Sequence, residues 1–320
     1  LARSRRATGR VLGQQLTGLL EEIADGGATC VGGSGSSDWS CGEDILRIGV
    51  STMPNLPRDI SDRNRTSPIA FTGNKFEFRS VGSSMSIAPM TLAINTVVAN
   101  ALDDIASDLE NAVGEGVPFN QAVQELLAAY FREHLPVVFN GNGYGKEWKQ
   151  EAERRGLPNL KDTITTLARY SDSDVMEAFL RHGVLTEREM LARQEILFES
   201  YIRQINVEVR LALSLGRTSI LPAAMAWLKE AGIVNHTGPG SSYYNNLQGH
   251  LSSLIESLDA LEDRFSKSAG VEDTHKKAAF LRDEVLPALA LCRKHADALE
   301  EIVDDRLWPL PKYTELLWEH

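Results

Sequence analysis

The sequence predicts an α+β fold that is predominantly helical and has few antiparallel strands. Two observations support this prediction. Only residues 44–50 and 75–81 have the β-favouring composition or alternation that strands show. From residue 90 to the C-terminus, apolar residues instead recur three and four positions apart, as they do along one face of a helix. With 320 residues, the chain is long enough for two domains and a sizeable core.

The N-terminal region is predicted to be a short helix followed by a loop. Leucines at helical spacing occupy residues 11–25, and the pattern stops at Gly26 and Gly27. Residues 26–42 are small, polar and rich in glycine, which is typical of a flexible loop. We therefore treat residues 1–42 as one segment, an N-terminal helix and a Gly/Ser-rich loop.

The region after this loop changes from strand to helix. Between the two predicted strands, regular structure is interrupted by three prolines, Pro54, Pro57 and Pro68. After Pro89, an apolar stripe across 90–112 predicts a helix, and the pattern predicts another at 119–134.

The C-terminal third is predicted to contain long packed helices. Thr186 and Glu189 have the spacing of a capping box, which opens a long helix. Two later stripes, separated by a turn that contains Gly270, predict an antiparallel helical hairpin. Their members are Leu247, Leu251, Leu254, Leu258, Leu261 and Phe265, then Leu281, Val285, Leu289, Cys292, Ala296, Leu299 and Val303. Within such a stripe, Cys292 is expected to be a small buried side chain rather than a nucleophile.

Composition limits the classes of function. A net charge of −11 and a pI near 5.2 argue against a nucleic-acid-binding surface, which needs clustered Lys and Arg. We also expect no membrane-spanning segment and no signal peptide, because no apolar run of about 20 residues stands out. The three cysteines lack a CxxC spacing, so neither a zinc site nor a disulfide framework is indicated. A reducing, cytoplasmic setting fits best.

Residues 64–79, NRTSPIAFTGNKFEFR, contain the best candidate site. In a strand, Lys75, Glu77 and Arg79 lie on one face, about 6 to 7 Å apart, and two phenylalanines lie on the other. A carboxylate between two cations can hold a metal while its neighbours hold phosphate or carboxylate oxygens. Alternation alone is equally typical of a surface strand with a solvated charged face.

This segment, with its lead-in DRNRTSP, resembles the C-terminal catalytic segment of glutamine synthetases, and FTGNKFEFR resembles their type III branch. The resemblance covers roughly residues 43–320. Downstream it rests on VVFNGNGYGKEW, EAERRGL, GVLTEREMLARQEILFESYIRQINVEVR, ILPAA and LWPLPKYTELL. It implies that 43–112 is the C-terminal segment of a glutamine synthetase catalytic domain and that 113–320 is a helical C-terminal domain.

The resemblance also implies an activity. Glutamine synthetases are ATP-dependent glutamate–ammonia ligases that form glutamine through γ-glutamyl phosphate. The implied cofactors are ATP and Mg²⁺ or Mn²⁺, the substrates are glutamate and ammonia, and the implied assembly is a homo-oligomeric ring. No nucleic acid or membrane partner is implied.

Individual roles follow from the same resemblance. Glu77 would be a metal ligand, and Arg79 would bind the substrate carboxylate or the transferring phosphate. Arg65 would contact phosphate, and Lys75 would contact the nucleotide where shorter enzymes have an arginine. Those enzymes carry another phosphate-binding arginine where this chain has Ala70. The lysine is also a real change, because an ammonium cannot make the bidentate contact of a guanidinium.

The resemblance leaves parts of a complete active site unaccounted for. The chain begins with Leu1, and residues 1–10 lack the substrate arginine and flap glutamate that the family usually has there. We therefore expect a C-terminal piece that is inactive alone, although its full-length protein would be a ligase. Two alternatives stay open: a helical interaction or oligomerisation module without activity of its own, and a related ligase that acts on amines or another acid.

Overall fold

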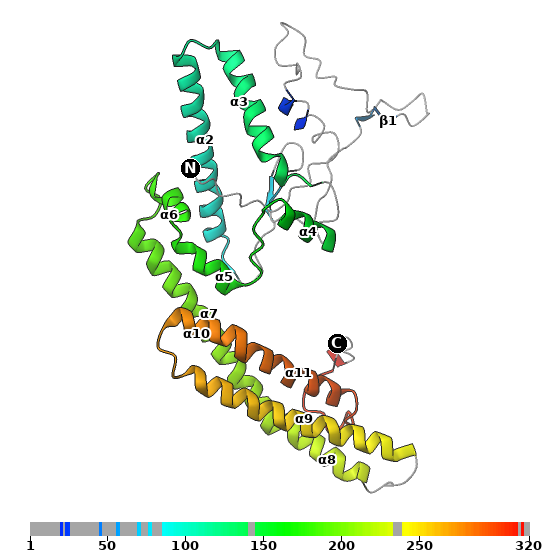
Figure 1. The fold of residues 1–320 in the computed structure, drawn as a ribbon. Helices are drawn as coiled ribbons and strands as arrows, with labels where there is room; N and C mark the ends of the chain where they lie inside the picture. The colour runs from blue at the N-terminus through cyan, green and yellow to red at the C-terminus, as the bar shows by residue number, and fades with distance from the viewer. Residues whose placement is uncertain are drawn as a thin grey trace. The chain divides into compact units, whose positions relative to one another are not determined.

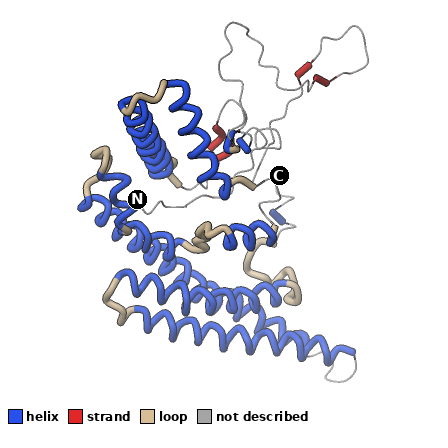
Figure 2. The backbone as a smooth tube through the Cα atoms, turned by 45° about the horizontal axis from the view of Figure 1, so that its top comes forward, coloured by secondary structure: helices blue, strands red, loops and turns tan. Residues whose placement is uncertain are grey.

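The computed structural model describes residues 20–21, 23–25, 45–46, 56–57, 69–71, 76–78, 85–139, 145–232, 239–312 and 315–316. Helices make up most of these residues (Figures 1 and 2), which confirms the prediction of a mainly helical fold. The chain divides into two compact units. The first contains residues 1–160 and 173–185, and the second contains residues 161–172 and 186–320.

The described strands of the first unit are short and paired in twos. β1 (Ile45–Leu46) pairs with β2 (Leu56–Pro57), and β3 (Ile69–Phe71) pairs with β4 (Phe76–Phe78), both antiparallel. β1 and β4 fall within the two segments that the sequence predicts as strands.

The helical part of the first unit is built around two adjacent helices, α2 (Ala88–Gly114) and α3 (Phe119–His134). They correspond to the helices predicted at 90–112 and 119–134. The Tyr130 hydroxyl donates to Asp108 across the pair at 2.9 Å. The shorter α6 (Ser173–Leu180) packs against α2, where the guanidinium of Arg181 reaches two aspartates of α2 at 2.5 and 2.6 Å.

Two short elements complete the described helices of the first unit. The 3₁₀ turn η1 (Leu135–Val137) continues from α3, and α4 (Lys146–Arg154) follows after a gap in the described residues. Their side chains form the pocket discussed below.

The regular elements described in the second unit are all helices or helical turns. Its elements are α5 (Thr163–Ala168), η2 (Arg169–Ser171), α7 (Glu187–Leu215), η3 (Gly216–Ile220), α8 (Leu221–Gly232), α9 (Pro239–Ser268), α10 (Thr274–Phe280), η4 (Leu281–Val285) and α11 (Leu286–Glu300). The predicted capping box at the start of α7 is confirmed, because Thr186 and Glu189 bond reciprocally. η3 and η4 are π-helical turns that join their neighbouring helices without a break.

The core of the second unit is an apolar seam between α9 and the helices around it. α11 and α8 both pack along α9 (Figure 1). Most members of the two predicted stripes are buried in one cluster with side chains from α7, η3 and α8. Cys292 is a buried free cysteine of this cluster, as predicted.

One continuous helix, from Glu187 to Gly232, is long and apolar enough to cross a membrane by length and composition alone. This is weak evidence for a membrane span, because core helices of soluble proteins pass the same test. Ile205, Val209 and Ala224 of this helix lie in the core cluster of the second unit. The absence of a membrane-spanning segment therefore stays a prediction.

The close approach of Gly216 to α9 generates a stability prediction. A Cβ at Gly216 would lie 2.7 Å from Cδ2 of Leu258, which is itself buried. Gly249 is an exposed helical glycine at which an added Cβ would meet nothing within 4 Å, so it is a matched control. Both Gly→Ala changes gain helix propensity, but only Gly216→Ala overpacks the core, at a cost of about 1–3 kcal/mol. Denaturant unfolding should find Gly216→Ala less stable than Gly249→Ala by that amount; equal stabilities would contradict the close approach.

A histidine in the same unit predicts a pH dependence. Burial, followed by the charges of His250 and Lys294, lowers the pKa of His295, and Glu256 opposes the shift. Nδ1 of His295 is buried without a hydrogen-bond partner among the described residues, and the His250 ring centroid lies 6.0 Å away. Because the unfolded chain then binds the proton more readily, this group costs stability as pH falls through about 6.5.

The measurement is the free energy of unfolding at pH 7.5 and 5.5 for the wild type and for His295→Gln, which does not titrate. The wild type should lose more stability than the variant on acidification. An equal loss in both proteins would show that His295 does not contribute to the pH dependence.

Candidate functional site

The site residues that the sequence predicts fall on the least described part of the chain. Arg65, Lys75 and Arg79 lie outside the described residues, and of Glu77 only the backbone, in β4, is described. The pairing of β3 with β4 places Ala70 directly opposite Glu77. Directly opposite positions of an antiparallel pair belong to the same face of the sheet. The position at which shorter enzymes have an arginine is therefore a cross-strand neighbour of the predicted metal ligand.

The described side chains do not form a metal centre. Among them, no group of three or more His, Cys, Asp or Glu residues is placed to hold a metal ion. Mg²⁺ needs near-octahedral oxygen coordination, and the carboxylate of Glu77 could supply only part of it. The metal-binding role of Glu77 therefore stays a prediction.

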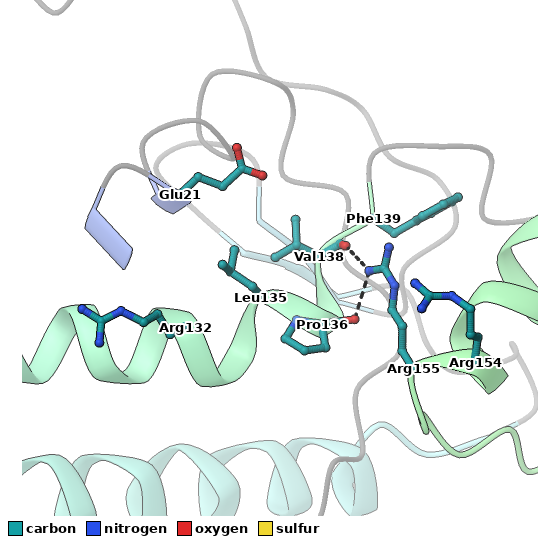
Figure 3. Close-up of a pocket in the computed structure, with 8 residues that line it drawn as sticks. All are labelled: Glu21, Arg132, Leu135, Pro136, Val138, Phe139, Arg154 and Arg155. Carbon is teal, nitrogen blue, oxygen red and sulfur yellow. Dashed lines mark hydrogen bonds between the residues drawn. The ribbon is translucent and has the colours of Figure 1, made fainter. Parts of the chain in front are cut away.

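The first unit contains an open pocket of about 500 Å³. It lies where α3 ends, η1 follows and α4 ends, with one residue from the N-terminal segment (Figure 3). Its lining is part cationic and part apolar: Glu21, Arg132, Leu135, Pro136, Val138, Phe139, Arg154 and Arg155. In Figure 3, Arg154 and Arg155 lie beside Phe139, and Arg132 lies toward the opposite end.

Arg155 is the best anchored of these arginines. Its Nη1 donates to the carbonyl oxygens of Pro136 at 3.1 Å and Val138 at 2.7 Å, and its Nε donates to Glu151. The guanidinium carbon also lies 5.9 Å from the ring centroid of Trp148, in range of a cation–π contact. Arg155 thus ties the end of α4 to the segment that follows α3.

Arg154 and Arg155 share the carboxylate of Glu151. Arg154 makes a bidentate pair with it, through Nε at 2.7 Å and Nη2 at 2.6 Å. The hydrogen bonds from Arg154 and then Arg155 lower the pKa of Glu151 to about 2, so it is ionised at any ordinary pH. Two guanidinium groups are therefore balanced by one carboxylate.

The opposite end of the pocket carries a third arginine. Nε of Arg132 donates to the backbone carbonyl of Ala24, which joins α3 to the N-terminal segment. Glu21 is the acidic residue of the lining. The three arginines of the described lining make it a surface that favours anions.

The sequence predictions did not identify this pocket. The pair Arg154–Arg155 after Glu151 is visible in EAERRGL, but adjacent charges on a helix usually indicate a solvated face. The carbonyls of Pro136 and Val138 and the ring of Trp148 distinguish Arg155 from a surface arginine.

Comparison with known proteins connects most of the chain to one family. Residues 122–234 match the model of the glutamine synthetase C-terminal domain, a range that includes most of the pocket lining. A type-3 glutamine synthetase of Dictyostelium discoideum is 37% identical over 87% of this chain. Glutamine synthetases of Bacteroides fragilis and Butyrivibrio fibrisolvens are 33% and 29% identical over 85% and 96% of it.

The chain spans 39 to 43% of the length of these relatives. Within that span, the matched domain and the identity to a type-3 enzyme agree with the resemblance noted in the sequence. The chain therefore belongs to the glutamine synthetase family, in its type III branch, and it corresponds to the part that carries the C-terminal domain.

Proposed function

We propose that this chain is the C-terminal part of an ATP-dependent glutamate–ammonia ligase, an enzyme of nitrogen metabolism. The observation that carries the proposal is the similarity to glutamine synthetases over 85 to 96% of the chain. The reaction would use glutamate and ammonia as substrates and ATP as the phosphoryl donor, in the cytoplasm.

The proposed chemistry has two steps. The γ-phosphoryl group of ATP is transferred to the side-chain carboxylate of glutamate, and ADP leaves. Ammonia then attacks the acyl phosphate, the C–O bond to phosphate breaks, and glutamine, phosphate and a proton are released. Divalent cations, Mg²⁺ or Mn²⁺, would neutralise phosphate charge when bound.

The residues of the 65–79 segment would supply charge and position. Glu77 would hold a cation with its carboxylate oxygens, and Arg65 and Arg79 would bind phosphate or the glutamate carboxylate. Lys75 would contact the nucleotide as a point charge. The register of β3 and β4, which makes Ala70 the neighbour of Glu77, supports a single site on this pair of strands.

A second candidate function is helical interaction or oligomerisation, with another copy of this chain as the partner. The observation that favours it is the exposed apolar surface of α2, on which Val97 and Leu102 are each 60% exposed. Val98, Ile105 and Val113 of α2 are exposed as well, and a helix of a soluble protein rarely leaves this many large apolar side chains in water. The ligase function and the oligomerisation function are compatible, since a ligase with several subunits would need contacts between them.

We also propose that α9 and the run from α10 to α11 form the antiparallel hairpin that their apolar stripes predict.

The ligase proposal predicts metal-dependent nucleotide binding. Calorimetric titration with ADP and Mg²⁺ should show weak binding by the chain, lost in Glu77→Ala and in Arg79→Ala. Glu125→Ala is the control, because Glu125 is an exposed carboxylate of α3 whose described bond is to Gln121 in the same helix. Loss in the control as well, or binding that persists in both site variants, would remove the 65–79 segment from the proposed site.

Catalysis by these 320 residues alone is a separate measurement. We expect no glutamine formation from glutamate, ammonia and ATP, because the resemblance assigns only one metal-binding carboxylate to this chain. Detectable turnover would contradict that expectation and show a more complete site than proposed.

A further inference from the structure

We propose that the exposed face of α7 binds the same face of a second copy of this chain, with the two helices antiparallel. This inference rests on the self-association proposed above, but it uses a surface of the second unit instead of α2. We define the α7 face by three large apolar side chains, Ile196, Val207 and Leu211.

These three side chains share one side of the helix. Ile196 and Val207 are eleven residues apart, about three turns, and Val207 and Leu211 are four residues apart, about one turn. The three side chains are 58%, 61% and 56% exposed, respectively. They therefore form an apolar stripe along about four turns of α7 that faces water.

The rest of the second unit packs on the other side of α7. The helices α5, α9 and α10 contact α7, and the α7 side chains buried there are Met190, Gln194, Phe198, Ile205 and Val209. Helical periodicity places these residues opposite the stripe. In the continuous helix Glu187–Gly232, only 22% of the most apolar 18-residue stretch is buried. Apolar surface that a chain leaves uncovered in this way is typical of an interaction site.

The charges beside the stripe favour a second copy as the occupant. Glu199, Arg203 and Arg210 lie on one flank of the stripe, and none of them takes part in the ion pairs described for this unit. Glu199 precedes both arginines along the helix. In a symmetric pair of antiparallel helices the same flank faces itself, so each Glu199 meets the arginine end of the partner helix. A parallel pair would instead bring like charges together.

The test is the mass of the intact chain in solution, measured by sedimentation velocity over a range of concentrations. Every variant carries Leu102→Asp, which places a charge on the exposed face of α2 and removes that face from association. This background chain should form a dimer of twice its 35.2 kDa mass. Adding Val207→Asp should raise the dissociation constant of the dimer about tenfold or more, because the new carboxylate is buried without a partner.

The matched control is Leu291→Asp in the same background. Leu291 is an apolar side chain of α11 that is 46% exposed and lies outside the α7 face, so the dimer should persist. Circular dichroism confirms that each variant is folded.

A charge swap tests whether the two copies recognise each other through the flank. Glu199→Arg makes the flank wholly basic, and Arg203→Glu combined with Arg210→Glu makes it wholly acidic. Each of these chains alone should dimerise less tightly than the background chain, and an equimolar mixture should form heterodimers. A mixture that associates no better than its components would overturn the inference.

The outcomes separate this inference from the proposed oligomerisation. A monomeric wild type would overturn both. A self-associating wild type with a monomeric background chain would assign the contact to α2 and overturn the inference alone. The inference also fails if Leu291→Asp disrupts the dimer as much as Val207→Asp does. Finally, a monomeric background chain that cosediments with anionic lipid vesicles, and loses this binding with Val207→Asp, would assign the α7 face to a lipid surface instead.

Discussion

The second unit depends on one constraint, the burial of the leucine seam of α9. Leu247, Leu254, Leu258 and Leu261 are at most 2% exposed, and each fully buried leucine contributes about 1.5–3 kcal/mol through removal from water. α7 and α8, which precede α9 in the sequence, and α11, which follows it, all pack against this seam. Because α9 is shared, its neighbours must approach it closely. Gly216 satisfies that requirement in the π turn η3, where any side chain would meet Leu258.

The first unit is organised differently, because little of its main helix is buried. On α2, Thr96 is the buried residue, and the described cross-links are polar: Arg181 with two aspartates, and Asn100 Nδ2 with the carbonyl of Ala178 at 2.9 Å. Exposed ion pairs contribute little, typically about 0–1 kcal/mol each. The partly buried contacts of Arg155 with two carbonyls and an indole define the geometry better, because they restrict the guanidinium to one position.

Both candidate sites on this chain belong to the first unit. The residues to which family resemblance assigns catalysis come from one short stretch of sequence, 65–79, of which the structure describes only β3 and β4. The pocket, by contrast, is assembled by helix ends whose positions are fixed through backbone carbonyls. The described lining of this pocket lies largely inside the matched C-terminal domain. The proposed catalytic residues and the described lining of the pocket share no side chain.

The sequence by itself determined the long helices and the buried faces of the two C-terminal ones. The stripes of α9 and α11, the capping box of α7 and the burial of Cys292 all follow from local spacing, because helix periodicity fixes which side chains share a face. It also supplied the family, and it predicts a site at Arg65, Lys75, Glu77 and Arg79. Tertiary structure alone decided the close approach at Gly216, the isolation of Nδ1 in His295 and the pocket around Arg154. Each depends on how closely elements distant in the sequence approach, and local spacing carries no information about that distance.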